Sequence, residues 1–344
     1  QPRQRQQRQR HGGVGRRGMF AGPIAASFYD EDPKETKLGP NVIASVRQLR
    51  DSVRWTPATV IQNDSANLDG SVRLLHVSVA DHVDLLYGRK VQGVLDTDKW
   101  IASFTVPGQT VGVRTPDESG GGNSVQPTQL YNIASSPYES RRDSAYRDAS
   151  IIEIVASRHG SDHERMLAEY GPGALIEVSQ VIGRGFASMF NPASNVASAV
   201  EAGRPIVVMA IGTRGIAPVR AMLNSAPVQA HATRAKISCI YVTKSATTAA
   251  FLPGWDLWRE AGVSFMPVYT EVYDPEDPAN EGEVDALMEQ VLFLREGGFA
   301  SLSGAPSDVV VLLSGVGRQA AAKLSKKLAD KGVEYDRMLF CDFF

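Results

Sequence analysis

Cysteine is nearly absent from this chain of 344 residues, which has only Cys239 and Cys341. An iron–sulfur cluster needs four thiolate ligands, so the chain cannot hold one on its own. Each cysteine lies in a short apolar segment (ISCIYV and RMLFCDF), which predicts two buried thiols in a reducing compartment. No metal site is expected.

Long apolar runs and a strong net charge are also missing. The longest apolar runs, at 206–211 and 309–313, are too short to cross a bilayer, so we expect no transmembrane segment. A formal charge of −2 gives no overall field that would favour nucleic acid. The composition, 43% hydrophobic and 22% charged, is that of an ordinary globular protein, and the length allows two domains.

The first 18 residues differ from the rest, because six arginines are interleaved with Gln and Gly and no acidic residue precedes Asp30. Arg-rich, acid-poor N-termini are typical of organelle transit segments. The alternative is a disordered basic arm that contacts a partner. A modest helix is predicted at 42–50, where Asn41 supplies the cap. We therefore set residues 1–54 apart as a basic tail and helix, a possible transit-peptide flank.

Residues 55–203 are predicted to form an antiparallel β-barrel. Short segments that alternate apolar and polar residues are separated by Gly, Pro, Asn and Asp, which is typical of such barrels. Extra sequence at 84–99 and a glycine-rich loop at 117–124 interrupt the pattern. The expected strands are 56–62, 72–79, 100–107, 110–116, 130–135, 150–157 and 174–180.

Residues 204–344 are predicted to form an α/β domain, because apolar strands now alternate with helical segments. That order indicates a parallel sheet covered on both faces. The acidic loop at 273–283 is rich in turn residues and is expected to be exposed. Strands are expected at 205–211, 237–243, 263–268, 308–314 and 337–342, and helices near 218–225, 254–261, 283–296 and 317–331.

The segment 204–225 is the most informative part of the chain. Its apolar run ends at Ile211, Gly212 and Gly215 then predict a tight turn, and Pro218 suits the first turn of a helix. A strand, a glycine turn and a helix N-terminus together make an anion site, since backbone N–H groups and the helix dipole favour a phosphate there.

This segment resembles a nucleotide-binding motif, Gly-Thr-Gly-Ile-Ala-Pro, of the ferredoxin–NADP reductase superfamily. The chain has Gly212, Thr213, Gly215, Ile216, Ala217 and Pro218, with Arg214 inserted among them. The order of a small barrel followed by a parallel α/β domain is also that of the superfamily, and it covers about 55–344. The resemblance implies an FAD-binding barrel followed by a Rossmann-like domain that binds NAD(P)H.

On the flavin side, the resemblance assigns an Arg-x-Tyr-Ser strand to the segment that starts at Gln129. Tyr131 keeps the aromatic ring that stacks on the flavin, while Gln129 replaces the Arg and Asn132 the Ser. The alternative is that Tyr131 only packs on its neighbours in the barrel. The other residues that the resemblance assigns to FAD are Ile133, Ala134 and Ser135 after this strand, Gly160 and Ser161 at a helix start, and Gly183, Gly185 and Phe186 at the barrel exit.

Two of these elements have an alternative interpretation. Ser161 and Asp162 can serve as ordinary helix caps, and His163 stands where the superfamily has Ser. Phe186 can seal the core between the domains, while Arg184 could replace the charge missing at Gln129.

On the nicotinamide side, Lys244 and Ser245 follow a strand where relatives contact the adenosine ribose, so they could bind a 2′-phosphate. Ser314 and Gly315 replace the Cys-Gly that lies beside the nicotinamide in the superfamily. Phe344, or Phe343, matches the terminal aromatic that covers the flavin in the superfamily; the alternative is that the two rings only pack onto a domain edge. The resemblance thus implies catalytic roles for Ser314 and Phe344.

Two functions follow from the resemblance. The first is an FAD-dependent NAD(P)H oxidoreductase that passes electrons between a nicotinamide nucleotide and a separate electron-carrier protein. The second is a catalytically weakened member that serves as an accessory subunit of a plastid (photosynthetic) complex, because four motif positions depart from the pattern: Gln129, Asn132, Arg214 and Ser314. With the Arg-rich start, both favour a location in the chloroplast, in the stroma or at the thylakoid.

Overall fold

The structure is a computed structural model that describes residues 55–80, 85–86, 89–90, 100–115, 128–142, 149–294 and 298–341. The chain divides into two compact units, Gln1–Asn41 and Val42–Phe344, and every described residue belongs to the second unit. The predictions for the basic tail, the helix at 42–50, the loop at 117–124 and Phe344 lie outside the described residues, as does most of 84–99.

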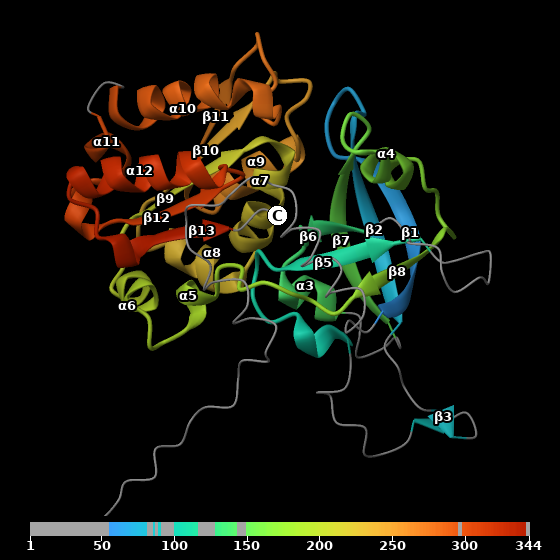
Figure 1. Cartoon of the computed structure of the whole chain (residues 1–344). Helices are drawn as coiled ribbons and strands as arrows, with labels where there is room; N and C mark the ends of the chain where they lie inside the picture. The colour runs from blue at the N-terminus through green and yellow to red at the C-terminus, as the bar shows by residue number, and fades with distance from the viewer. Residues whose placement is uncertain are drawn as a thin grey trace, which may run out of the picture. The chain divides into compact units, whose positions relative to one another are not determined.

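The first part of the described chain is a six-stranded antiparallel sheet with the strand order β6-β5-β8-β1-β2-β7 (Figure 1). A bridge between Ile133 and Ile154 joins the end of β6 to β7. The two edge strands therefore meet, and the sheet closes into the predicted barrel. Its strands are β1 (Trp55–Ser65), β2 (Val72–Ala80), β5 (Thr110–Arg114), β6 (Thr128–Asn132), β7 (Ala149–Ser157) and β8 (Leu175–Ser179).

The strand predicted at 100–107 is wrong, since Trp100–Ser103 forms a 3₁₀ helix. Trp100, Ile101 and Phe104 are all buried. Their spacing fits one face of a helical turn and not the alternation of a strand. The indole of Trp100 donates to the carbonyl oxygen of Ser179 at 2.8 Å, which fastens this turn to the end of β8.

The second part is a parallel five-stranded sheet with the order β11-β10-β9-β12-β13, as the α/β pattern predicts. The central strand β9 is buried at every position, which explains its uninterrupted apolar sequence. The strands are β9 (Ile206–Ile211), β10 (Ile237–Thr243), β11 (Val263–Tyr269), β12 (Val310–Ser314) and β13 (Met338–Cys341).

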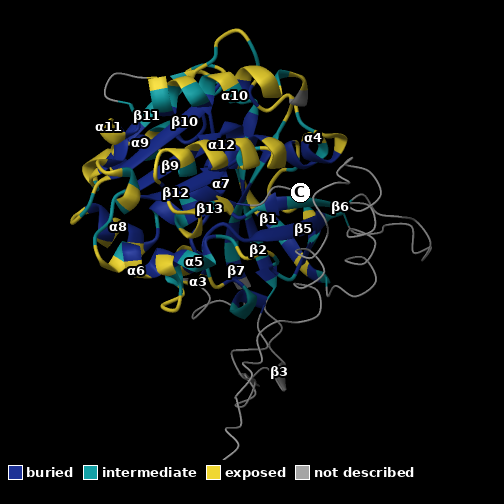
Figure 2. Ribbon diagram, turned by 60° about the vertical axis from the view of Figure 1, so that its left-hand side comes forward, coloured by how far each residue is buried: buried dark blue, intermediate teal, exposed yellow. Residues whose placement is uncertain are grey.

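Helices cover both faces of this parallel sheet, and Figure 2 shows their exposed outer sides around a buried centre. One face packs on α7 (Gly212–Leu223), α8 (Ala226–Ala232) and α9 (Leu252–Glu260). The other packs on α10 (Glu281–Glu289) and α12 (Arg318–Asp330). The shorter helices are α3 (Pro137–Arg142), α4 (Asp162–Ala168), α5 (Ala187–Phe190), α6 (Asn195–Glu201) and α11 (Ala300–Ser303).

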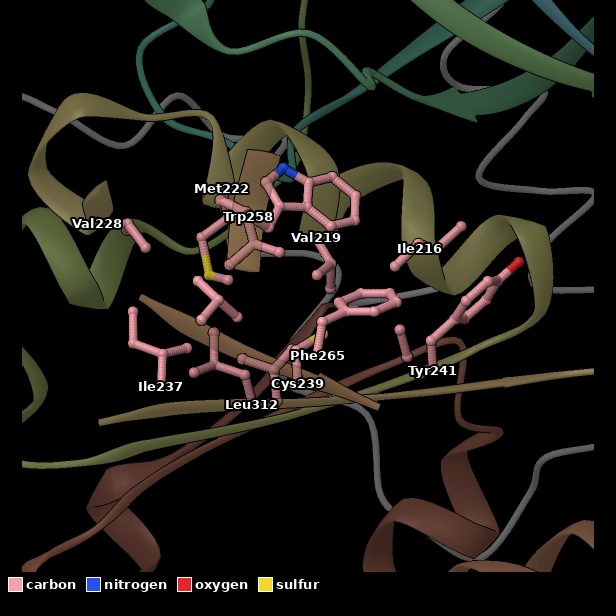
Figure 3. Close-up of a cluster of buried hydrophobic side chains, with 14 of the residues drawn as sticks. Ile216, Val219, Met222, Val228, Ile237, Cys239, Tyr241, Trp258, Phe265 and Leu312 are labelled. Atoms are coloured by element: carbon pink, nitrogen blue, oxygen red, sulfur yellow. The ribbon is translucent and has the colours of Figure 1, made fainter. Parts of the chain in front are cut away.

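The core on the α7 side is dominated by aromatic and branched side chains. Figure 3 shows Trp258 of α9 and Met222 of α7 above Phe265 and Leu312 of the sheet. The rings of Trp258 and Phe265 have centroids 5.2 Å apart. This cluster also contains Ala66, Val72 and Ala134 of the barrel, so the two parts of the chain share buried apolar contacts.

Helix α7 begins earlier than predicted. The sequence places a glycine turn at 212–215 and a helix start at Pro218, whereas the structure has helix from Gly212 onward with Pro218 inside it. Because proline has no N–H, the carbonyl oxygen of Arg214 receives no helical hydrogen bond from position 218. The side-chain amide of Asn132 approaches that oxygen instead, at 3.4 Å.

Candidate functional site

The N-terminus of α7 is the part of the structure that the sequence assigns to a nucleotide phosphate. Gly212 has φ 63°, a left-handed conformation that glycine adopts without strain. A Cβ at this position would lie 2.1 Å from Cγ of Glu276. The backbone N–H of Arg214 donates to Oε1 of Glu276 at 3.0 Å, and Thr213 provides a second backbone donor to this carboxylate. The Glu276 carboxylate therefore accepts the hydrogen bonds that the N–H groups at the start of α7 would otherwise donate to a phosphate.

The carboxyl group of Glu276 is packed against α7, although the residue as a whole remains exposed. Burial of the carboxyl raises the pKa of Glu276, while the backbone donors and the nearby Arg214 cation oppose that shift. Holding the ionised carboxylate here therefore has a net desolvation cost.

Gly215 and Gly315 allow α7 and the ends of β9 and β12 to approach one another closely. A Cβ on Gly215 would lie 2.6 Å from the carbonyl oxygen of Ser314, and one on Gly315 would lie 2.2 Å from that of Ile211. Ser314 is fully buried and its hydroxyl donates to the carbonyl oxygen of Gly215 at 2.8 Å. In this structure the glycines serve the packing of α7 on β12, and the Ser314 hydroxyl is held in that packing.

Arg214, the inserted residue of the motif, connects several of these groups. Its backbone N–H donates a hydrogen bond to Glu276, and its guanidinium forms an ion pair with Oε2 of Glu164 at 3.2 Å. Two acids thus raise the pKa of Arg214 against the opposing effect of burial, and Glu164 contributes more than Glu276. Arg214 therefore links the carboxylates that lie at the starts of α4 and α7.

The N-terminus of α4, predicted to receive the flavin pyrophosphate, is closed by a capping box. The Ser161 hydroxyl accepts from the N–H of Glu164 at 3.1 Å, and Oε2 of Glu164 accepts from the N–H of Ser161 at 3.0 Å. A Cβ on Gly160 would lie 1.7 Å from the same Oε2. Glu164 is 4% exposed, so a buried carboxylate fills the space beside Gly160. The cap role, the simpler alternative for Ser161, is confirmed.

The predicted flavin strand contacts α4 directly. Tyr131 is 4% exposed and belongs to the barrel core, and its hydroxyl lies 2.8 Å from Nδ1 of His163. Gln129 and Ser161 also form a side-chain hydrogen bond. Tyr131 and Gln129, which the resemblance assigns to the flavin ring and its phosphate, are thus joined to the start of α4 by side-chain hydrogen bonds.

Burial governs the protonation of this cluster. It lowers the pKa of His163, with Glu164 opposing, and raises the pKa of Tyr131 well above its usual range. Both side chains are therefore neutral near pH 7. Two buried polar atoms nearby, Nε2 of His163 and Oδ1 of Asn132, have no hydrogen-bond partner among the described residues.

The remaining predicted flavin residues serve the interior. Ile133, Ala134 and Ser135 are buried, and the Ser135 hydroxyl contacts Ser140 at 2.9 Å and the N–H of Glu153 at 3.1 Å. The carbonyl oxygen of Ala134 accepts from Arg220 at 2.8 Å. None of the three is positioned on an open surface.

The turn at the barrel exit packs against the loop before β5. Phe186 is fully buried, and a Cβ on Gly185 would lie 2.4 Å from the carbonyl oxygen of Pro107. The carbonyl oxygen of Gly183 accepts from Gln109 at 3.0 Å. Of the two interpretations left open for Phe186, the structure favours the one in which it seals the core.

At the end of β10, Lys244 is exposed and Ser245 forms hydrogen bonds with the hydroxyls of Thr247 and Thr248, at 3.0 and 3.2 Å. Lys244 is accessible to an anion, whereas Ser245 caps its own turn. Of the two residues predicted to bind a 2′-phosphate, Lys244 is therefore accessible, while the Ser245 hydroxyl is engaged in hydrogen bonds within its own turn.

Sequence reasoning missed the acidic residues of the site. These are Glu164, three residues after Ser161, and Glu276, which lies in the acidic loop at 273–283. It also missed the pair between Arg220 of α7 and Glu153 of β7, whose side chains are 16% and 15% exposed. An acidic residue near a helix start is a weak signal, because such residues stabilise helix N-termini without any further role.

The residues present do not fit FAD or NAD(P)H in this arrangement. A pyrophosphate at either helix start would meet the carboxylate of Glu164 or Glu276, and like charges repel strongly where water is excluded. A flavin ring would have to replace the contact between Tyr131 and His163. Among the described residues there is also no cluster that could hold a metal ion, and no helix long and apolar enough to span a membrane.

No protein-family profile and no curated protein sequence matches this chain. Solved structures do. The cytochrome P450 reductase GcoB of Amycolatopsis is 15% identical with a TM-score of 0.53, over 85% of this chain and 70% of its own. A ferredoxin–NADP⁺ reductase from Neisseria gonorrhoeae, solved with bound FAD and NADP, is 14% identical with a TM-score of 0.51, over 83% of this chain and 97% of its own.

The ferredoxin–NADP⁺ reductase from Plasmodium falciparum is 12% identical with a TM-score of 0.51, over 83% of this chain and 95% of its own. The chain therefore has the two-part fold of ferredoxin–NADP reductase-like proteins, as predicted. At this level of identity the similarity establishes the fold, and function must be argued from the site.

Proposed function

We propose that this chain is a reductase-fold protein that works as an accessory subunit of a larger assembly, with its nucleotide sites closed by its own side chains. One observation carries the proposal: Arg214 links Glu164 and Glu276, whose carboxylates lie at the two helix starts that the resemblance assigns to cofactor phosphates. The Glu276 carboxylate accepts from the N–H groups of Thr213 and Arg214, and the Glu164 carboxylate accepts from that of Ser161.

The contacts between the barrel and the α/β part support this proposal. Besides Arg214 and Glu164, Arg220 pairs with Glu153 and donates to the carbonyl oxygen of Ala134. The backbone N–H of Phe251 donates to the carbonyl oxygen of Ala66 at 2.7 Å. These bonds fasten α7 and the loop before α9 to the barrel. An arrangement closed by such contacts suits a structural subunit.

The second candidate is an FAD-dependent NAD(P)H oxidoreductase that passes electrons to a separate carrier. The fold favours it, and so do the two unpaired buried atoms, Nε2 of His163 and Oδ1 of Asn132, since buried polar atoms normally find a partner. When bound, a flavin supplies the hydride and single-electron chemistry. For this function, Tyr131 and His163 would have to separate and Glu164 would have to leave Gly160.

We also propose a plastid location, which the Arg-rich, acid-poor first 18 residues favour. The same segment, as a basic arm, suits an acidic partner surface. Deletion of residues 1–54 is therefore expected to release the protein from its assembly in native extracts, while the reductase fold survives.

The deciding experiment is the visible absorption spectrum of the purified chain, followed by addition of FAD at high micromolar concentration. We expect colourless protein that retains no flavin and does not oxidise NADPH or NADH. We also expect the full chain to migrate in native extracts as part of an assembly larger than a monomer. Yellow protein that NADPH or NADH bleaches without oxygen would establish the oxidoreductase instead.

A further inference from the structure

The loop that follows β11 is shaped to present one carboxylate to α7. The backbone N–H of Glu276 donates to Oδ1 of Asp274 at 2.9 Å, and the side-chain amide of Asn280 donates to the carbonyl oxygen of Asp274 at 3.0 Å. Pro275 is buried beside them. These turns fix the loop locally, so the position of the Glu276 side chain does not depend on α7 alone.

The Glu276 carboxylate takes the place of an external anion at this helix start. It receives the N–H of Arg214 at 3.0 Å and a second backbone bond from Thr213, and its chain lies over Gly212, where no Cβ blocks it. Glycine at this position and backbone donors aimed outward are the features with which helix starts bind phosphates. Here the same features hold a side chain.

Glu276 is held less firmly than the acid at the other helix start. The guanidinium of Arg214 pairs with Glu164 and contacts Glu276 only through its backbone N–H. Burial raises the pKa of Glu276, so its ionised form is under a net desolvation penalty. The residue is exposed overall, as are Asp274 and Asp277 in the same loop.

We propose that Glu276 is an autoinhibitory anion, which occupies the N-terminus of α7 and must leave before a pyrophosphate-containing nucleotide can bind there. This inference rests on the proposed function, in which both helix starts are closed. It adds that the N-terminus of α7 can still bind an anion when the Glu276 side chain leaves. Once the Glu276 side chain has left, the N–H groups of Thr213 and Arg214 beside Gly212 form an anion site. In the unchanged chain, Glu276 occupies that site.

The test compares Glu276→Gln and Glu276→Ala with the unchanged chain, with calorimetric titration of inorganic pyrophosphate and of NADPH. Removal of the carboxylate frees two backbone donors and removes a like charge, so we expect affinity to rise by about tenfold or more. The gain should shrink as salt is added. The alanine variant covers the case in which the glutamine oxygen keeps accepting the same hydrogen bonds.

Asp277→Asn is the matched control. Asp277 lies in the same loop and carries the same charge, and its Oδ1 accepts from the N–H of Ala279, which asparagine can also do. We expect no gain in affinity from this change. An equal gain in the control would mean that only the net charge of the loop matters, and it would overturn the proposal.

Two failures are distinguishable. Folded Glu276 variants that bind neither probe better than the unchanged chain would overturn this inference and leave the proposed function standing. The proposed function would be overturned if the unchanged chain bound a flavin that NADPH reduces. This inference would be overturned if the unchanged chain bound NADPH tightly, because Glu276 would then not block the site. Thermal unfolding of each variant confirms that it is folded.

Discussion

The guanidinium of Arg214 lies 3.2 Å from the Glu164 carboxylate, and this ion pair joins the first turn of α7 to the first turn of α4. Arg214 is the residue that interrupts the glycine motif, and Glu164 is the acid that caps the other helix. The same insertion that weakens the resemblance to a nucleotide-binding motif therefore supplies the cation that closes the site.

Replacement of Arg214 by methionine should destabilise the fold by about 1–2 kcal/mol, because Glu164 is buried and would lose its cation. The loss stays moderate because the Arg214 side chain is 55% exposed and solvent screens the pair. Urea unfolding monitored by fluorescence measures the change. Arg165→Met is the control, since its pair with Asp162 is at the surface and should contribute less than about 0.5 kcal/mol.

The Arg220–Glu153 pair is more deeply buried and should have a larger effect. Glu153→Gln leaves the guanidinium without its carboxylate, and we expect a loss of about 3 kcal/mol. The double variant Arg220→Met with Glu153→Gln should recover part of that loss, because no buried charge is left unpaired. With Arg220→Met measured as well, a double variant whose loss equals the sum of the two single losses would show that the pair does not interact energetically.

Gly215→Ala should destabilise the protein by about 1–3 kcal/mol, as overpacking usually does. Its Cβ would lie 2.6 Å from the carbonyl oxygen of Ser314, so α7 must move away from β12. Gly171→Ala is the control, since a Cβ there meets nothing within 4 Å. The comparison is read from thermal unfolding. A stable Gly215→Ala protein would contradict the packing role that the structure gives this glycine.

Stability should fall as the pH drops below about 6.5, with His163 as one cause. Burial lowers the pKa of His163 from its usual 6.5, so in this window the unfolded chain binds a proton that the folded chain does not. Protonation therefore favours the unfolded state, and the stability present above pH 6.5 is progressively lost.

His163→Gln should reduce this dependence while it retains a partner for the Tyr131 hydroxyl. Thermal unfolding of both proteins at pH 7.5 and pH 5.5, about one unit either side of the reference value, measures the effect. The difference between the two pH values should be smaller in the variant. The same difference in both proteins would show that other groups control the acid sensitivity.

The sequence predicted the architecture well because the architecture depends on local patterns. Alternating residues identified most barrel strands, and uniformly apolar segments identified the buried parallel strands. The prediction failed at 100–107, where the buried residues Trp100, Ile101 and Phe104 follow a helical spacing. The helix α8 at Ala226–Ala232 was not predicted either, because its seven residues are too few for a clear periodic pattern.

The sequence by itself determined that a strand, a glycine and a helix start would make an anion site at Gly212, since those features lie within a few neighbouring residues. Only the tertiary structure decided which anion meets that site. Glu276 is 62 residues away from Arg214 in the chain and Glu164 is 50 residues away, and no local pattern connects such positions. Their approach depends on how the sheet, the barrel and the loop after β11 pack, and that packing places carboxylates of the chain where the motif alone predicts phosphates.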